Sequence, residues 1–180
     1  MAKRRTAAAK ASSWPEEVHG VFKDTRVRQV AYVPDAGHAR LIGLCLADAR
    51  IRTILLTTEE EGVASLAGAW LGGERGALLL QSSGVGNCIN MLGMIRECRF
   101  PLLALVTMRG EWGEFNPWQV PMGRGTAAAL TNAGVIVHHV DEAAKVGETV
   151  FAASHLAFDA SQGVAVLISQ RVLGFKDWDR

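Results

Sequence analysis

Residues 76–107 read GALLLQSSGVGNCINMLGMIRECRFPLLALVT, two apolar runs on either side of a glycine-rich polar segment. The runs ALLL and LLALV are continuous rather than alternating, as expected for strands buried on both faces of a sheet. They predict strands over 76–83 and 101–107, and residues 84–98 between them predict a helix that opens on glycine. A strand, a helix and a second strand form the repeating unit of a parallel α/β sheet.

The same alternation continues on both sides of this stretch. The further strands are expected at 27–34, 51–57, 135–140 and 163–169, and the further helices at 36–50, 59–71, 123–134 and 141–160. We therefore predict an α/β fold, a doubly wound and mostly parallel six-stranded sheet with helices on both faces. Residues 108–122 predict a loop with two tryptophans. No repeat and no linker interrupts the pattern, which favours a single domain over 14–180.

Composition excludes several classes of protein. Of the 180 residues, 49% are hydrophobic and the net charge is +1, which argues against disorder and against binding of nucleic acid through bulk charge. Charges or glycines interrupt every apolar run, so we expect no membrane span. Residues 1–13, MAKRRTAAAKASS, lack an apolar segment and predict a flexible basic arm rather than a secretory signal.

The cysteines indicate the compartment. Cys45, Cys88 and Cys98 are odd in number and form no Cys-x-x-Cys pair. This pattern is typical of a reducing compartment, so we expect a cytoplasmic protein in which all three are small buried hydrophobic residues.

Common catalytic and nucleotide-binding fingerprints are missing. Gly84 and Gly86 begin a G-x-G-x-x-G pattern, but Ile89 stands where the third glycine belongs. The chain contains no P-loop, His-Glu-x-x-His or Gly-x-Ser-x-Gly segment, and no His, Cys and Asp cluster with metal-ligand spacing. We expect no metal ligands in this chain.

An acidic triplet lies at one predicted strand-to-helix junction. Glu59, Glu60 and Glu61 follow Thr58, and Thr58 with Glu61 has the spacing of a capping box. Acidic residues in a first helical turn are explained by the helix dipole alone. The helix behind them, however, is uncharged and rich in glycine and alanine from Gly62 onward. That composition favours an interface helix, with one carboxylate delivered into a buried site.

A second polar segment follows the strand at 76–83. QSSGVGNCIN, residues 81–90, surrounds two glycines with amide and hydroxyl side chains. A tight turn with Ser83 as a helix N-cap explains it equally well. The alternative is a place where the backbone closely approaches a polar, uncharged ligand.

Four segments in this order together resemble one family. TTEEEGVASLAGAWLGG, ALLLQSSGVGNCIN, PLLALVTMRGEWGE and QVPMGR look like the pyrimidine-binding half of thiamine-diphosphate-dependent 2-oxoacid decarboxylases. The similarity is to the alpha subunit of sulfopyruvate decarboxylase and the N-terminal part of phosphonopyruvate decarboxylase. YVPDAGHARLI also resembles their N-terminal motif, so the likeness covers roughly residues 27–170.

The resemblance assigns a role to one glutamate. In this family a glutamate hydrogen-bonds N1′ of the cofactor aminopyrimidine, and the 4′-nitrogen then removes the thiazolium C2 proton. Counting back from Ala67 and Gly68 places that glutamate at Glu59, which is also nearest the strand end. Glu60 and Glu61 remain alternatives.

The resemblance also implies cofactor and substrate residues. It places Gln81, Ser82, Ser83, Gly84, Gly86 and Asn87 beside the cofactor pyrimidine. The candidates for facing a small anionic 2-oxoacid are Asp35, His38, Arg109, Gln119 and Arg124. Salt bridges or helix caps explain several of these side chains equally well.

One motif of the complete enzymes is missing. The superfamily holds Mg²⁺ and the diphosphate with a Gly-Asp-Gly segment and a later Asn, and this chain has no Gly-Asp-Gly. The resemblance therefore implies a hetero-oligomer that shares thiamine diphosphate with a beta subunit, which binds Mg²⁺. Two alternatives stay open: a non-catalytic binding or regulatory homologue, and a flavodoxin-like nucleotide-binding domain. The latter is disfavoured because Gly84–Asn87 has no nearby Lys or Arg.

Overall fold

The computed structural model describes residues 13–174, which form one six-stranded sheet with parallel pairing throughout. The strand order is β2-β1-β3-β4-β6-β5. The strands are β1 (Val27–Tyr32), β2 (Arg52–Leu55), β3 (Arg75–Gln81), β4 (Leu102–Thr107), β5 (Ile136–Val140) and β6 (Gly163–Ile168). The predicted α/β class and strand number are confirmed, and the described sheet is entirely rather than mostly parallel.

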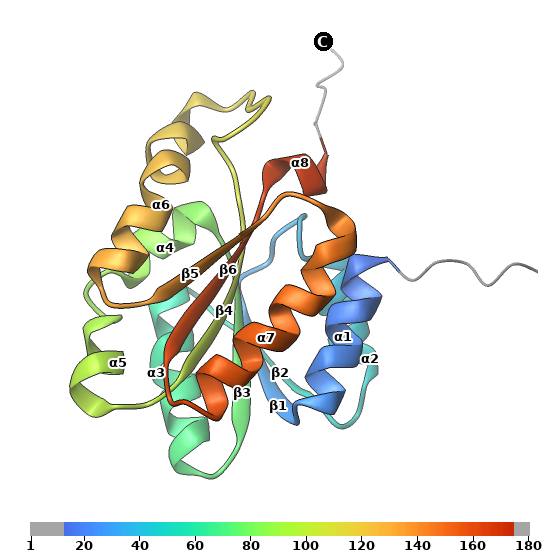
Figure 1. Cartoon of the computed structure of the whole chain (residues 1–180), viewed down its shortest axis with the longest axis vertical. Helices are drawn as coiled ribbons and strands as arrows, with labels where there is room; N and C mark the ends of the chain where they lie inside the picture. The colour runs from blue at the N-terminus through green and yellow to red at the C-terminus, as the bar shows by residue number, and fades with distance from the viewer. Residues whose placement is uncertain (1–12, 175–180) are drawn as a thin grey trace, which may run out of the picture.

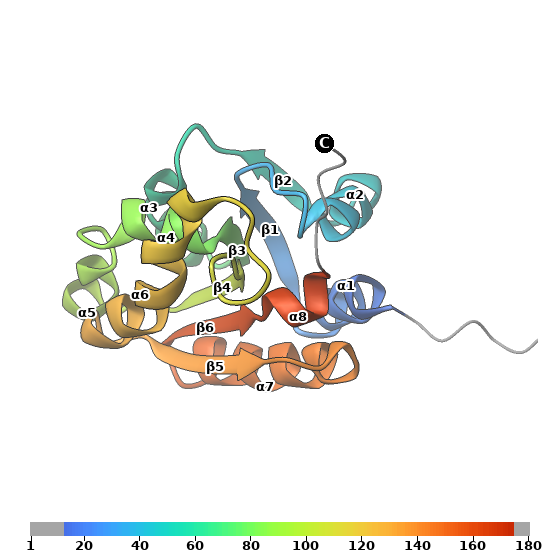
Figure 2. The same cartoon turned by 90° about the horizontal axis from the view of Figure 1, so that it is seen from above.

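Helices cover both faces of the sheet, as Figures 1 and 2 show. One face carries α1 (Trp14–Asp24), α2 (Ala39–Ala47) and α7 (Val146–Phe158). The other carries α3 (Glu59–Leu71), α4 (Ser82–Cys88), α5 (Gly93–Cys98) and α6 (Val120–Asn132). The short α8 (Gln170–Leu173) follows β6 beyond the carboxyl end of the sheet.

Strand alternation divides the core into two clusters. In β3, Leu79 packs with α1, α2 and α7, whereas Leu78 and Leu80 pack with the helices of the opposite face. Every residue of β4 and β6 is buried, because both strands lie inside the sheet and are covered on both sides. The continuous apolar runs of the sequence therefore correspond to its central strands.

The parallel register brings polar residues together at the carboxyl edge. Gln81, the last residue of β3, is paired with Thr107, the last residue of β4, and Thr107 is paired with Ile168 of β6. The loops after these strands therefore begin side by side. In open α/β sheets this edge is where ligands bind.

Some element boundaries differ from those predicted. The predicted helix 84–98 is two helices, α4 and α5, and α4 begins at Ser82, before its first glycine. Helix α6 begins at Val120 rather than at 123, with Pro121 in its first turn. No helix is predicted from the sequence over 14–26, where α1 buries Val18 and Phe22.

Two further expectations concern the cysteines and the chain ends. Cys45 and Cys88 are buried as expected, but Cys98 is exposed at the end of α5, so the prediction that all three are buried is wrong.

Residues 1–12 of the predicted basic arm lie outside the described residues, and Ser13 is the N-cap of α1. Within 13–174, every helix is too short or too polar to cross a membrane.

Candidate active site at the carboxyl edge of the sheet

Glu59 is buried at the start of α3, directly after the loop that follows β2. The residue is 8% exposed, and Asn87 Nδ2 of α4 donates a 2.7 Å hydrogen bond to its Oε2. Gly84 lies beneath the carboxylate, because a Cβ on Gly84 would stand 2.3 Å from Glu59 Oε1. The glycine therefore leaves the space that the carboxylate occupies, and Asn87 fixes its orientation.

The other two glutamates have different surroundings. Glu60 is half-buried and accepts a hydrogen bond from the Thr58 hydroxyl, which holds the pKa of Glu60 below its usual value. Glu61 is exposed and accepts from the backbone N–H of Thr57 at 2.9 Å. The predicted capping box is wrong in detail, because the Thr58 side chain caps no backbone N–H of α3. Glu59 alone of the triplet turns inward.

The backbone of α4 is held firmly against α6 and the loop after β4. The buried Ser82 Oγ accepts a 3.0 Å hydrogen bond from the N–H of Arg109, and the Ser82 carbonyl accepts one from Thr126 Oγ1 at 3.3 Å. Gly86 approaches Met122, whose Sδ would lie 3.4 Å from a Cβ on that glycine. These contacts fix the position of α4 relative to Glu59.

A hydrogen-bonded chain joins α4 to the loop after β1. Ser83 Oγ donates to Gln81 Oε1 at 2.9 Å, and Gln81 Nε2 donates to Asp35 Oδ1 at 3.0 Å. Thr107 Oγ1 donates to the other oxygen of Asp35. Burial raises the pKa of Asp35, but the hydrogen bonds from Thr107 and Gln81 and the neighbouring His38 outweigh it, so the pKa lies below its usual value. Asp35 is therefore a carboxylate at neutral pH.

His38 is a core residue rather than an open ligand. It is fully buried, and its Nε2 lies 3.0 Å from the carbonyl oxygen of Leu105. Burial lowers its pKa, although the charge of Asp35 acts in the opposite direction. His38 thus supports the loop that carries Asp35 and is neutral at pH 7.

Arg109 is bound by Glu114, which is not among the site residues predicted from the sequence. Its Nε and one terminal nitrogen donate to the two oxygens of Glu114 at 2.7 and 2.6 Å. Glu114 also accepts from Gln170 Nε2 at 3.0 Å and from the backbone N–H of Gly110. The Arg109 hydrogen bonds lower the pKa of Glu114 to about 2. Arg109 thus orders the loop in this structure.

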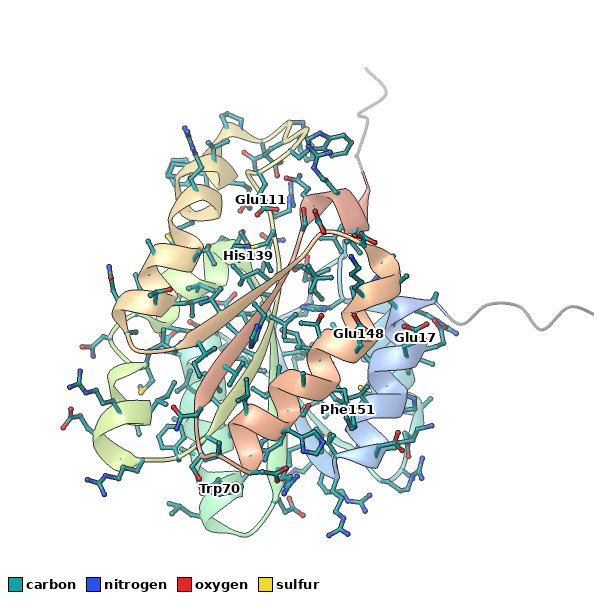
Figure 3. All side chains as sticks on the ribbon, in the orientation of Figure 1. Glu17, Trp70, Glu111, His139, Glu148 and Phe151 are labelled. Atoms are coloured by element: carbon teal, nitrogen blue, oxygen red, sulfur yellow. The ribbon has the colours of Figure 1, made fainter. Side chains whose placement is uncertain are left out.

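Gln170 extends this network to the end of the sheet. Its side-chain Oε1 accepts hydrogen bonds from the backbone N–H groups of Glu111 and Trp112 at 3.2 and 3.1 Å. The backbone N–H of Gln170 donates in turn to Glu111 Oε2. Figure 3 shows Glu111 near the carboxyl edge, at the opposite end of the molecule from Trp70. No motif in the sequence indicates Gln170 or Glu114, since each acts through a contact formed only by folding.

The remaining predicted substrate residues lie around α6. Gln119 immediately precedes the helix, and its Oε1 is buried without a hydrogen-bond partner among the described residues. Arg124 is exposed on the helix itself. Gly123 permits the close approach of α6, because a Cβ there would stand 1.9 Å from the Arg109 carbonyl oxygen.

A small pocket opens between the loops after β1, β4 and β6. Its volume is about 80 Å³, enough for a few heavy atoms. It is lined by Asp35, Ala36, Gly37, Thr107, Arg109, Phe115, Gln170, Leu173 and Gly174. Through Asp35 and Gln81 the pocket is linked to α4, and through Gly84 to the Glu59 carboxylate.

The side chains around Glu59 suit proton transfer to an organic group better than they suit metal coordination. Residues 13–174 contain no group of three or more His, Cys, Asp or Glu side chains arranged to hold a metal ion. Glu59 Oε1, in contrast, has no hydrogen bond within that range, while Asn87 holds Oε2. A buried carboxylate with one oxygen fixed and one available can exchange a proton with a ligand nitrogen.

Comparison with solved structures identifies the fold. A 2-oxoglutarate:ferredoxin oxidoreductase from Magnetococcus marinus superposes with a TM-score of 0.74 at 16% identity. The match covers 91% of this chain and 30% of that one, so the chain spans about a third of its length. The protein has a thiamine-diphosphate-type α/β fold.

Sequence comparison identifies the family within that class. The sulfopyruvate decarboxylase subunit alpha of Methanococcus maripaludis is 32% identical over 154 residues, covering 85% of this chain and 92% of that subunit. The chain belongs to the family of sulfopyruvate decarboxylase alpha subunits. A sulfopyruvate decarboxylase of Methanosarcina acetivorans is 34% identical over 73% of this chain but only 34% of its own length. No family model matches the chain.

Proposed function

We propose that this chain is the pyrimidine-binding subunit of a heteromeric thiamine-diphosphate-dependent 2-oxoacid decarboxylase, with Glu59 activating the cofactor. The observation that carries the proposal is the Glu59 carboxylate, buried at a strand end and held at Oε2 by Asn87. The relatives named as alpha subunits support a decarboxylase subunit, and the fold supports the cofactor class.

The residues around Glu59 fit an aminopyrimidine. Gly84 lets the Glu59 carboxylate lie against the backbone of α4, because any side chain at that position would take the same space. Glu59 Oε1 would hold the proton shared with N1′, and Asn87 would keep the carboxylate aimed while that proton moves. When bound, thiamine diphosphate supplies the electron sink that accepts the electron pair left by loss of CO₂.

The diphosphate and Mg²⁺ require a second polypeptide in this proposal. The chain lacks Gly-Asp-Gly, and residues 13–174 offer no carboxylate cluster for a metal. The longer relative from Methanosarcina acetivorans, which this chain matches over only a third of its length, supports the same division of labour. We expect a beta subunit to bind Mg²⁺ and the diphosphate. The three free cysteines support a cytoplasmic location.

A reconstitution experiment tests this function. The chain and a candidate partner that contains Gly-Asp-Gly are purified separately and mixed with thiamine diphosphate, Mg²⁺ and a panel of 2-oxoacids. CO₂ release should require both chains. Turnover by this chain alone would contradict the shared site, and a stable complex without turnover on any 2-oxoacid would favour the non-catalytic homologue.

A further inference from the structure

We infer that the 80 Å³ pocket beside Asp35 receives the side chain of the 2-oxoacid, and that this side chain is short and uncharged rather than a sulfonate or phosphonate. This inference rests on the proposed function, because it names the substrate class of the same site. It follows from the charges and surfaces that line the pocket.

Among the described residues that line the pocket, Arg109 is the single cation, and it is already neutralised. Arg109 donates two hydrogen bonds to Glu114, whose side chain is 3% exposed. This ion pair stays charged at neutral pH, since the pKa of Glu114 is lowered to about 2 and that of Arg109 is raised. A sulfonate would have to displace a buried bidentate carboxylate in order to bind the guanidinium.

A second residue of the lining carries a negative charge. Asp35 is ionised at neutral pH and is held by donors from Gln81 and Thr107, which leaves no proton to offer to an anion. With Arg109 and Glu114 cancelling, the carboxylate of Asp35 sets the local charge. An anionic side chain placed here would be repelled in a partly desolvated site.

Part of the remaining lining is apolar, and Thr107 and Gln170 add polar groups to it. Ala36, Phe115 and Leu173 supply hydrocarbon surface, and Gly37 and Gly174 also line the pocket. A pocket of about 80 Å³ fits a methyl, ethyl or hydroxymethyl group. A methyl group gains from burial against the apolar part of this lining and carries no charge that must be desolvated.

A pair of substrates that differ only in this group tests the inference. Sulfopyruvate and 2-oxobutyrate share the 2-oxoacid and the adjoining CH₂, but one ends in a sulfonate and the other in a methyl. For the complete two-chain enzyme, kcat/KM should favour 2-oxobutyrate by about tenfold or more. A preference for sulfopyruvate would overturn the inference while leaving the proposed decarboxylase function intact.

A positive charge added to the pocket should weaken the preference for 2-oxobutyrate. Leu173→Lys places an ammonium group in the lining, and the ratio of kcat/KM for sulfopyruvate to that for 2-oxobutyrate should rise about tenfold. Leu46→Lys makes the same change on the exposed face of α2 and should leave the ratio unchanged. If Leu173→Lys folds and the ratio is unchanged, the substrate side chain does not bind in this pocket. If that variant does not fold, the wild-type ratio still decides.

Binding measured without turnover separates the two proposals. Saturation-transfer NMR on the same complex reports whether the CH₂ protons of each acid contact the protein. Selective contact by 2-oxobutyrate without any CO₂ release would support the pocket and refute the decarboxylase. Equal or stronger contact by sulfopyruvate would overturn the pocket assignment whatever the turnover.

Discussion

The Asn87 amide donates a 2.7 Å hydrogen bond to Glu59 Oε2, and it does so from α4 to the first residue of α3. The two residues are 28 positions apart in sequence, and each follows a different strand of the sheet. The bond leaves Oε1 as the oxygen of Glu59 that faces Gly84. The orientation of the proposed catalytic carboxylate is therefore set by a neighbouring helix.

Replacing Asn87 should reduce activity in proportion to the damage to this bond. Asn87→Ala removes the donor, and we expect a loss of about tenfold in kcat for the two-chain enzyme. Asn87→Asp should be worse, because a second carboxylate beside Glu59 repels it. Asn90→Asp adds the same charge on an exposed residue nearby and serves as the control. Equal activities of the Asn87 variants and wild type would contradict the assigned role.

The space at Gly84 gives a second test. A Cβ at this position would stand 2.3 Å from Glu59 Oε1 and 2.4 Å from Cδ, so Gly84→Ala must displace the carboxylate. Activity should fall at least tenfold. Gly43→Ala, in helix α2 with no atom within 4 Å of the new Cβ, should stabilise the fold by about 0.5 kcal/mol and leave activity intact. Full activity in Gly84→Ala would show that the close approach is unimportant.

Glu114 should contribute strongly to stability at neutral pH. Glu114→Gln breaks the buried pair with Arg109 and should lower the free energy of unfolding by about 2 kcal/mol in urea titrations at pH 7. Glu142→Gln breaks the exposed pair with Lys145 and should cost less than about 0.5 kcal/mol. Similar losses in both variants would contradict the buried network.

The same ion pair predicts a pH dependence. The Arg109 hydrogen bonds lower the pKa of Glu114 to about 2, from an ordinary value of 4.5. A carboxyl with a depressed folded-state pKa contributes stability that is fully present above about pH 5 and is lost as the pH falls toward 2. Glu114→Gln should therefore flatten the acid limb of the stability curve. An acid limb identical to that of wild type would rule out a lowered pKa for Glu114.

Thiol labelling checks the correction at Cys98. Cys98 is exposed and should react rapidly with a thiol reagent in the native protein. Burial raises the pKa of both Cys45 and Cys88 to about 12, so those thiols should react only on unfolding. Mass spectrometry should find one label before denaturation and three after it. A native Cys98→Ser protein that still labels rapidly would mean that the buried thiols open easily.

The sequence predicted the central sheet better than the site around it. The unbroken apolar runs of β3 and β4 predicted buried parallel strands, because burial on both faces leaves no alternation. The break between α4 and α5 was not predicted, although Asn90 and Gly93 inside the run are residue types that favour helix ends. The family resemblance indicates Arg109 as a site residue but does not indicate its partner Glu114. The loop residues between them show no helical or strand periodicity from which their contact could be predicted.

Proton exchange at the cofactor tests the central claim most directly. The two-chain enzyme is loaded with thiamine diphosphate and Mg²⁺, and hydrogen–deuterium exchange at the thiazolium C2 is followed by NMR in quenched samples. Glu59→Gln should slow exchange by at least about a hundredfold while the complex stays assembled. Glu61→Gln, which alters only the exposed carboxylate bound to the Thr57 N–H, should exchange at the wild-type rate. Near-normal exchange in Glu59→Gln would contradict the account.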